Sequence, residues 1–525
     1  MSYDVVIVGS GFGGAVAACR LAHAGRSVLV LERGRRWTPD QYPRGPDDAW
    51  VWEQDEPEVH NGWIDLRFFN HMWVAQGAGV GGGSLIYANI SIDAKPTTFN
   101  AGWPSQISYE VLRPHYERVA DMLGSGPLPD GQLTRRFKLM QEAASKTGAA
   151  DRFRKLDLAV TFDDAWSYDL PDAVNARHSK PWTNRFGKRQ GTCFHCGNCD
   201  IGCPVHAKNT LDLNYIADAE RAGALVQPLS LVTHISQADG GWRVHYDRLT
   251  EGRREPSDVT ATRVIVAAGS LGSTEILLRS RDQYGTLAHL SRHLGRNWSS
   301  NGDFLTPALY GTRAVDPTIG PTITCAIDYL DGSDKGARFF VEDGGFPNVL
   351  RNFNRAKLRR VGRFGPAAAF LRYLMRNASV EDPLAGVMPW FGQGVDAANG
   401  DFYLGRRWYA PWRRHLALDW DVTDSEDAIN GLVEMHKKLS AATGGEAIVP
   451  PTWTVLHQLV TPHPLGGCGM AASRSAGVTD HAGRVYDHPG LYVFDGSIVP
   501  RPLGLNPSKT IAALSERGAE LLLRE

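Results

Sequence analysis

Residues 5–32 decide the fold class, and they read VVIVGSGFGGAVAACRLAHAGRSVLVLE. The apolar run at residues 5–8 is typical of a buried parallel strand. Residues 15–22 are good helix formers, and a second apolar strand at residues 27–31 ends at Glu32. This stretch follows the order of a dinucleotide-binding unit: a strand, the motif G-x-G-x-x-G, a helix, a second strand and an acidic residue. This order predicts an α/β fold.

Each part of this loop has a physical task. Gly9 allows a tight turn, Gly11 lets the backbone approach a pyrophosphate, and Gly14 lets the helix pack closely on the strand. The helix start offers free N–H groups to phosphates, and Glu32 can accept hydrogen bonds from ribose hydroxyls. We expect contacts to the dinucleotide from Gly9, Gly11, Phe12, Gly13, Gly14, Glu32 and Arg33. The motif does not separate FAD from NAD, although its position at residue 9 favours FAD.

Further glycine-rich loops and apolar strands follow along the chain. Residues 76–84 form a second glycine-rich run, which lets backbone amides wrap a flat or charged ligand. Residues 264–268 form another buried strand that ends in small residues, and residues 273–279 read as a helix. Near the end come three short motifs and an amphipathic helix, at residues 461–468, 491–497, 503–508 and 509–523.

Together these segments resemble the glucose–methanol–choline (GMC) oxidoreductase family, in its cholesterol-oxidase-like bacterial branch. The resemblance rests on the loops at 9–14 and 79–84, the run His463-Pro464-Leu465-Gly466-Gly467, and Asn506-Pro507. It implies FAD and oxidation of an alcohol by hydride transfer to the flavin. Further FAD contacts are expected from Gly79, Gly81, Gly82, Gly83, Ser84, Asn89, Val232, Ala268, Gly269, Asp495, Gly496, Asn506 and Pro507.

The predicted architecture has two parts. Residues 1–45, 70–100, 190–305 and 455–525 are expected to form a discontinuous, Rossmann-like FAD-binding domain. Residues 46–69, 101–189 and 306–454 are expected to form a substrate-binding lobe, with an antiparallel sheet and helices on it.

His463 and Asn506 are the predicted catalytic residues. Alcohol oxidation needs a group of near-neutral pKa at the hydroxyl, and histidine is the usual choice. From the residues alone a buried structural histidine is the favoured interpretation of His463, but the resemblance reverses it, because His463 falls on the family's active-site histidine. Asn506 followed by Pro507 also predicts a helix N-cap, a role compatible with binding the substrate or the flavin.

One departure concerns the substrate. Sterol oxidases carry an acid in the substrate lobe that helps to isomerise the steroid double bond. The stretch that corresponds here, residues 384–396, has no acid at the expected place, with Glu381 and Asp382 just before it. Isomerase activity and a sterol substrate are therefore open at this stage.

Cys193, Cys196, Cys199 and Cys203 give C-x2-C-x2-C-x3-C-P, the run that binds iron–sulfur clusters in bacterial ferredoxins. Three of these thiolates could hold a [3Fe–4S] cluster, whereas a [4Fe–4S] cluster would need either a remote ligand, Cys325 or Cys468, or a rearranged loop. A zinc site or reduced structural thiols would also fit. A cluster would send electrons to a protein acceptor, and without one oxygen or a soluble acceptor would take them.

Composition excludes other classes. Among 525 residues, 56 Lys and Arg balance 57 Asp and Glu, so a nucleic-acid partner is not expected. No apolar run is long enough to span a membrane and no signal peptide is visible, which predicts a cytoplasmic protein. The basic stretch from Arg351 to Arg376 allows peripheral membrane contact, although a solvated helix face is the commoner use of such a pattern.

Two other functions remain possible from the sequence. One is an FAD and iron–sulfur reductase or desaturase acting on a C=C bond. The other is a non-catalytic electron-transfer flavoprotein, which would have no need of the His463 and Asn506 pair.

Overall fold

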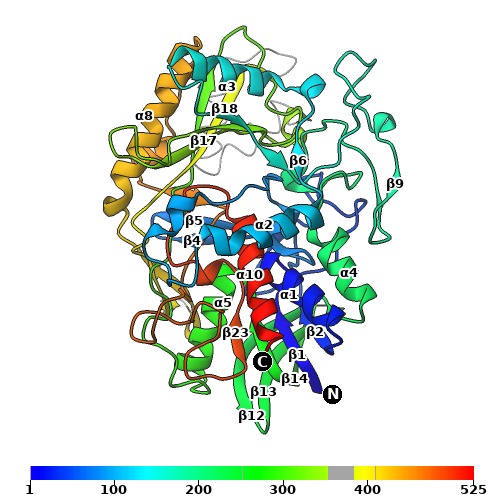
Figure 1. Cartoon of the computed structure of the whole chain (residues 1–525), viewed down its shortest axis with the longest axis vertical. Helices are drawn as coiled ribbons and strands as arrows, with labels where there is room; N and C mark the ends of the chain where they lie inside the picture. Colours follow the sequence, from blue (N-terminus) through cyan, green and yellow to red (C-terminus); the bar gives the residue numbers. More distant parts are fainter. Residues whose placement is uncertain (1, 251, 353–383, 408–409) are drawn as a thin grey trace.

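The structure is a computed structural model that describes residues 2–250, 252–352, 384–407 and 410–525. Figure 1 shows two stacked parts: one holds both termini, and the other carries α3 and α8 against β17 and β18. The larger sheets of the described residues have seven, six and four strands.

The seven-stranded sheet has the order β11-β2-β1-β14-β13-β12, with β23 also paired to β14. Parallel pairs join β1 to β2 and β14, β2 to β11, and β14 to β23, whereas β12, β13 and β14 form an antiparallel meander. Its strands are β1 (Ser2–Val8), β2 (Val28–Leu31), β11 (Leu225–Gln227), β12 (Ser230–Ala238), β13 (Gly241–Thr250), β14 (Arg253–Val266) and β23 (Leu491–Val493). The parallel strands are apolar because they are buried on both faces.

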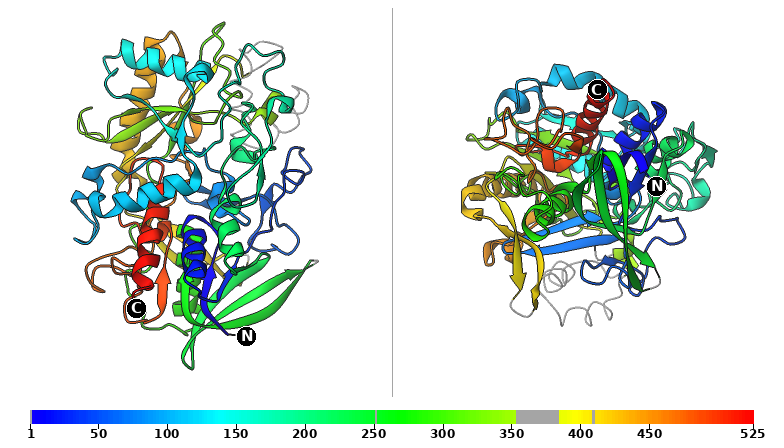
Figure 2. Two further views of the ribbon diagram at one scale, coloured as in Figure 1. Left: turned by 45° about the vertical axis from the view of Figure 1, so that its right-hand side comes forward. Right: turned by 90° about the horizontal axis from the view of Figure 1, so that it is seen from below.

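Helices from both ends of the chain cover this sheet. α1 (Phe12–His23) contacts α10 (Ser508–Leu522) and α4 (Tyr215–Arg221), and α10 also contacts α2 (Tyr109–Leu123). Figure 2 shows α10, in red, beside α1, in blue. α5 (Gly269–Leu278) lies against β12.

The six-stranded sheet has the order β21-β15-β18-β17-β16-β7 and is antiparallel throughout. Its strands are β7 (Phe153–Lys155), β15 (Phe304–Leu309), β16 (Cys325–Asp328), β17 (Phe339–Asp343), β18 (Val387–Gly394) and β21 (Glu446–Ala447). α3 (Arg135–Lys146) and α8 (Glu426–Ala442) pack on it and on each other.

The four-stranded sheet, β22-β5-β4-β3, matters because β22 leads directly to His463. It contains β3 (Val51–Trp52), β4 (Ile64–Phe69), β5 (Met72–Gly77) and β22 (Leu459–Thr461). The remaining β-strands and a short α-helix are β6 (Gly126–Pro127), β8 (Asp157–Leu158), β9 (Trp182–Thr183), β10 (Arg189–Gln190), β19 (Asp401–Arg407), β20 (Ala410–Asp419) and α9 (Pro451–Thr454).

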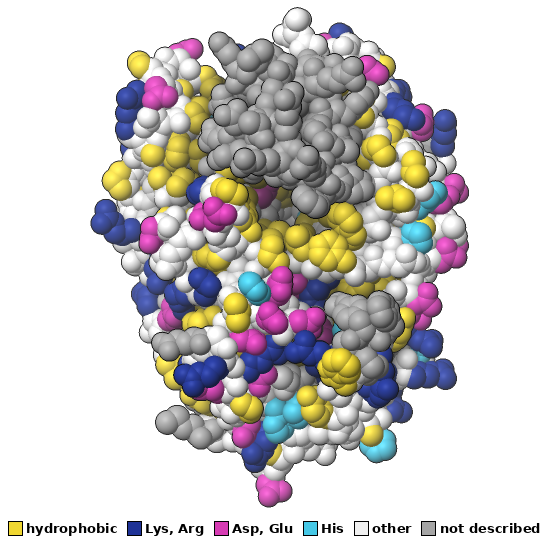
Figure 3. All heavy atoms as spheres, turned by 180° about the vertical axis from the view of Figure 1, so that it is seen from behind, with side chains coloured by type: hydrophobic (Ala, Val, Ile, Leu, Met, Phe, Trp, Pro, Cys, Tyr) yellow, Lys and Arg dark blue, Asp and Glu magenta, His cyan; other side chains and the backbone are white. Residues whose placement is uncertain are grey.

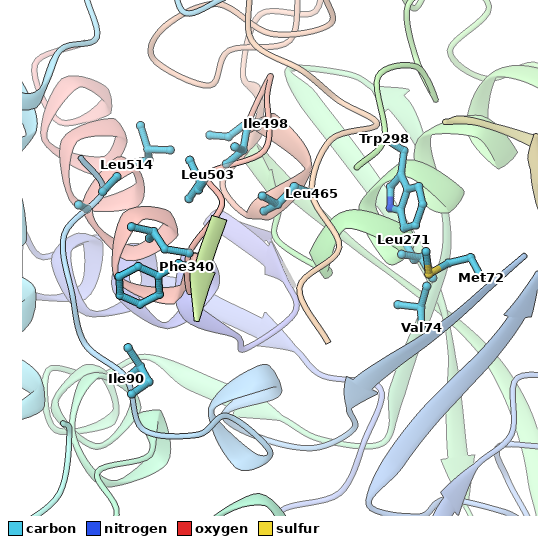
Figure 4. Close-up of a cluster of buried hydrophobic side chains, with 14 of the residues drawn as sticks. Met72, Val74, Ile90, Leu271, Trp298, Phe340, Leu465, Ile498, Leu503 and Leu514 are labelled. Carbon is cyan, nitrogen blue, oxygen red and sulfur yellow. The ribbon is translucent and has the colours of Figure 1, made fainter. Parts of the chain in front are cut away.

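The core joins these layers. Figure 4 shows Leu465, Ile498 and Leu503 close together, with Met72, Val74 and Trp298 forming a second group beside Leu271. All of these side chains are buried, with no more than 3% exposed. The chain around His463 is therefore anchored in packed apolar surface, which fixes the position of the loop.

The predicted fold class is confirmed: parallel α/β pairing in one part and an antiparallel sheet with helices in the other. The helix expected at 15–22 extends over Phe12–His23, and the strand expected at 264–268 is the end of β14. The predicted domain border at residues 69 and 70 falls between β4 and β5, which pair with each other. The basic stretch 351–376 lies almost entirely outside the described residues.

Candidate active site

Close backbone contacts shape the first glycine loop. Gly9 has φ +97°, a conformation that favours glycine. A Cβ on Gly13 would lie 1.5 Å from the carbonyl oxygen of Phe494, and one on Gly14 would lie 2.0 Å from that of Gly9. Larger residues at these positions would push α1 away from the sheet.

Gly11 is different because it faces open space. The nearest atom to a Cβ built on Gly11 is the Cα of Gly82, at 3.9 Å, and one on Gly83 would meet nothing within 4 Å. Gly82 itself has φ +52°, and its Cβ would lie 2.6 Å from the Cα of Gly11. The two glycine loops therefore touch each other and leave an open gap in front of the first residues of α1.

Glu32 is held in place by the first loop. Its carboxylate accepts hydrogen bonds from the Ser10 N–H at 3.0 Å, the Ser10 hydroxyl at 2.6 Å and the Gly34 N–H at 2.9 Å. Burial raises the pKa of Glu32 above its usual value, although these donors and Arg33 oppose that effect. The carboxylate is thus fixed at the cavity wall, where the sequence analysis expected a ribose contact.

A cavity of about 910 Å³ extends from this loop to His463. Many of the predicted FAD-binding residues line it: Gly9, Gly11, Phe12, Gly13, Glu32, Arg33, Gly82, Gly83, Val232, Ala268, Gly269, Asp495, Gly496, Asn506 and Pro507. The start of α1, two glycines with no obstructing neighbour and this length of lining fit a flavin dinucleotide.

The other predicted FAD-binding residues do not line the cavity. Gly14 packs under the first loop, and the Ser84 hydroxyl donates to the Gly81 carbonyl at 2.7 Å inside the second. Gly79 packs against Trp37. Asn89 is fully buried, and its side chain faces the Cys199 thiol.

His463 lies in the cavity wall and is paired with Asp303. The Nδ1 atom of His463 is 2.8 Å from Asp303 Oδ1, and the His463 N–H donates to Thr461 Oγ1 at 2.8 Å. Thr461 Oγ1 in turn lies 2.5 Å from Asp303 Oδ2. Because Asp303 occupies Nδ1, Nε2 is the ring nitrogen left for a ligand.

Two opposing effects set the basicity of His463. Burial alone favours the neutral ring, but the hydrogen-bonded Asp303 carboxylate and the nearby Glu342 outweigh it, and the pKa of His463 is raised. Burial also raises the pKa of Asp303, and its bond to His463 limits that shift. An imidazole held this way accepts a proton more readily than a free buried one.

Asn506 lines the same cavity, and the expectation that it caps the last helix is wrong. α10 begins at Ser508, its N-cap is Pro507, and no side chain caps it. Within the described residues, Asn506 Oδ1 is buried and has no hydrogen-bond partner. Its amide oxygen is therefore available to a ligand.

Behind Asn506 lies an acid that the sequence analysis missed. Glu342 on β17 is fully buried, accepts a hydrogen bond from Gln393 Nε2 at 2.9 Å and contacts the side chain of Asn506. Burial raises the pKa of Glu342 to about 8, so the carboxyl group is mostly protonated at neutral pH.

Residues 384–396 have no acid at the expected place, but a buried acid, Glu342, lies beside this stretch without being among the residues that line the cavity. Residues 384–396 contain β18, and β17 pairs with it so that Glu342 stands opposite Phe391. The acid comes from the neighbouring strand, about 50 residues earlier in the chain. The signal in the sequence is the acidic pair that ends the apolar strand Phe339–Asp343.

The four cysteines of the ferredoxin-like run line one small cavity, together with Lys208. Cys325 and Cys468, the expected remote ligands, are not among its lining residues. Cys325 lies against Met140 Sδ at 3.5 Å, and Cys468 lies near Thr274 Oγ1. Cys203, and neither of the two remote cysteines, therefore lies at the same small cavity as Cys193, Cys196 and Cys199.

Comparison with known proteins agrees with this site. Two family models, both described as GMC oxidoreductase, match residues 3–300 and 409–515. The chain belongs to the GMC oxidoreductase family and is an FAD-dependent oxidoreductase.

Among curated proteins, a cholesterol oxidase of Acinetobacter baumannii is 30% identical, over 98% of this chain and 93% of its own. A cholesterol oxidase of Mycobacterium tuberculosis (strain ATCC 25618 / H37Rv) is 31% identical, over 99% and 91%. Among solved structures, a pyridoxine 4-oxidase from Mesorbium loti aligns with a TM-score of 0.65 at 16% identity, over 99% of both chains. That structural likeness shows the shared fold.

Proposed function

We propose that this protein oxidises the hydroxyl group of a bulky apolar alcohol, such as a sterol or a terpenoid-like alcohol, and that bound FAD accepts the hydride. The observation that carries the proposal is the His463 and Asp303 pair in the wall of the large cavity. A histidine in a cavity wall whose pKa is raised by a specific charged partner is a candidate functional group.

The chain's own residues account for the proton. Nε2 of His463 accepts the hydroxyl proton, and the Asp303 carboxylate stabilises the charged imidazole that results. The Asn506 amide holds the alcohol oxygen beside His463. Bound FAD supplies the acceptor for the carbinol hydride.

The substrate end of the cavity is apolar. Residues from several elements provide hydrophobic lining there: Phe304, Leu305, Ile323, Phe346, Phe391 and Leu459. Apolar walls of this kind favour a substrate with a large hydrocarbon body. The names of the two cholesterol oxidases support a sterol among such substrates.

Glu342 supports a second step on a sterol. Oxidation of a 3-hydroxy-5-ene sterol leaves a ketone whose double bond can move into conjugation, and that move needs a group that takes and returns a proton. Glu342, with a pKa of about 8 and a place beside Asn506, is suited to that task.

The electron acceptor is oxygen or a protein. Names among the relatives include both oxidases and a 2-methyl-1,2-propanediol dehydrogenase, so family membership alone does not choose between them. A protein acceptor needs a path for single electrons, and the cysteine loop beside the cavity is the candidate for that path.

We place the protein in a reducing compartment, the cytoplasm, because all seven cysteines are unpaired. No helix in the described ranges has the length and apolar character needed to cross a membrane.

Figure 3 shows hydrophobic side chains gathered across the middle of one face. Val455 and Leu456, 72% and 52% exposed, follow the cavity-lining residues Pro450 and Thr452, which supports peripheral contact with a lipid surface at the mouth of the cavity.

Replacement of the histidine tests the proposal. In His463→Ala the FAD should stay bound, and anaerobic flavin reduction by an apolar alcohol should slow by about 10²-fold or more, the scale of general-base loss. His60→Ala is the matched control, since His60 is about half exposed at the surface. Unchanged reduction in His463→Ala would refute the catalytic role.

A further inference from the structure

The cysteine loop brings four thiols to one place. Cys193, Cys196, Cys199 and Cys203 all line a small cavity closed by Val160, Val205, Ala207, Lys208 and Gly320. The loop is anchored by the Cys193 N–H, which donates to Thr161 O at 2.8 Å, and by the His195 carbonyl, which accepts from Gly320 N–H at 2.9 Å. Four cysteines at one internal cavity without a disulfide among them are typical of a metal centre.

The spacing of the thiols argues against a single zinc ion. A tetrahedral zinc site needs sulfur atoms about 3.8 Å apart, as follows from Zn–S bonds of about 2.3 Å. Within the described residues, no three of these thiols lie within 4.8 Å of one another. A polynuclear cluster holds its cysteines further apart, because several metal ions lie between them.

The backbone of the loop turns its N–H groups toward the sulfur atoms. The N–H of His195 lies 3.4 Å from Cys193 Sγ, and the N–H of Ala207 lies 3.2 Å from Cys203 Sγ. Two non-glycine residues adopt positive φ in this loop, His195 at +59° and His206 at +56°. Such strain persists where the surroundings fix it, and N–H groups facing thiolate sulfurs are a feature of iron–sulfur sites.

The positively charged side chains around the loop would also suit a bound anion. Lys208 is buried, and its Nζ donates to the carbonyls of Cys199, Leu85 and Tyr87 at 2.7, 2.9 and 2.9 Å. Arg44 donates to two carbonyls inside the loop. Asp200 and Asp212 act on Lys208 electrostatically, as do the Cys199 and Cys203 thiols. A cluster with four thiolate ligands carries net negative charge, and it would add to the compensation of this buried lysine.

We infer that the loop Cys193–Cys203 holds one [4Fe–4S] cluster, with all four ligands supplied by Cys193, Cys196, Cys199 and Cys203. The fully buried Asn89 amide faces Cys199 and has no hydrogen-bond partner among the described residues, so it is the polar side chain aimed at the ligand set.

The site borders the flavin cavity. Asp200 and Ile201 follow Cys199 directly and line the large cavity, and Lys208 connects the loop to Tyr87, which also lines it. Each alcohol oxidised releases two electrons and two protons in total. A cluster at this place would supply one-electron transfer to a carrier protein, so two carrier molecules would be reduced for each carbonyl formed, and the protons would go to solvent. This electron role rests on the proposed function, whereas the cluster site does not.

The test is the metal content of the whole protein, purified anaerobically. Wild type should contain about four iron and four acid-labile sulfide per chain, with the cluster seen by electron paramagnetic resonance after reduction. Cys199→Ser and Cys203→Ser should lose iron and sulfide together while they keep FAD. Cys325→Ser and Cys468→Ser are the controls, and both should keep the full iron content.

Several outcomes would overturn the inference. Bound zinc, or metal-free wild-type protein even after anaerobic reconstitution with iron and sulfide, would rule out the cluster. Three irons with no effect of Cys203→Ser would rule out the four-cysteine ligand set. Wild-type iron and sulfide are measured without any turnover, so failure of alcohol oxidation leaves this test intact. If the serine variants do not fold, the wild-type content still decides.

Discussion

Nδ1 of His463 lies 2.8 Å from Oδ1 of Asp303, a residue 160 positions earlier in the chain. Asp303 directly precedes β15 of the six-stranded sheet, and His463 follows β22 of the four-stranded sheet. The pair therefore couples the basicity of the histidine to the relative position of two sheets. Its consequences can be measured by pH-dependent kinetics.

Asp303→Asn should shift the pH dependence of catalysis. The Asp303 carboxylate raises the pKa of His463, and burial alone lowers it, so removal of the charge should lower that pKa below its usual value. The base form of His463 would then persist to lower pH, and the acidic limb of the flavin-reduction rate should move to lower pH. The maximal rate should fall, on the order of tenfold or more, because the imidazolium loses its partner. Stopped-flow flavin reduction across pH gives both values, and an acidic limb that does not move would contradict this coupling.

Glu342→Gln should change stability in a pH-dependent way. Glu342 has a folded-state pKa of about 8, raised from 4.5, so its contribution to stability is fully present below 4.5 and is lost as the pH rises to about 8. Glutamine has no proton to lose, so the variant should gain stability relative to wild type as the pH rises through this window. Urea unfolding midpoints compared below and above this range measure it. A constant difference between the two proteins would mean that Glu342 does not titrate there.

The same variant tests the proposed second step. With a 3-hydroxy-5-ene sterol, Glu342→Gln should still form the ketone but leave the double bond unconjugated, and the ultraviolet spectrum of the product distinguishes the two. Conjugated product at the wild-type rate would assign the proton transfer to another group.

Gly11→Val should fold but fail to retain FAD. The built Cβ of Gly11 meets no protein atom closer than 3.9 Å, so the side chain would extend into the gap in front of α1. The purified variant should be nearly colourless and should not bind added FAD. Gly131→Ala is a suitable control, since a Cβ there has no neighbour within 4 Å. Normal flavin content in Gly11→Val would show that the dinucleotide lies elsewhere.

Glu516→Gln should destabilise the junction of the helices. The buried Glu516 carboxylate binds Arg20 at 2.7 Å, Arg118 at 3.2 Å and the Tyr215 hydroxyl at 2.7 Å. Since both arginines are partly exposed, the loss should be about 1–3 kcal/mol, less than for a fully buried pair. Glu520→Gln, on the exposed side of the same helix, should change stability by less than about 0.5 kcal/mol. Equal unfolding midpoints for the two variants would count against a role for this network.

The sequence predicted well those features that depend on local pattern. The loop around Gly9, its helix and the strands beside it were predictable because glycine spacing and apolar runs act over a few residues. Asp303 and Glu342 were missed because strand pairing, which no local pattern encodes, brings them to His463 and Asn506. The cap assigned to Asn506 was wrong because the helix starts later, after Pro507, which leaves the amide oxygen free.

The pairing of α1 with α10, and of β14 with β23, has a consequence for how the protein is made. A ribosome completes the first glycine loop early, yet the strand and helix that close around it, residues 491–522, emerge only after almost all of the chain has been synthesised. The carbonyl of Phe494, against which Gly13 packs, belongs to this late segment. The flavin pocket of a nascent chain thus stays incomplete until this last segment has docked.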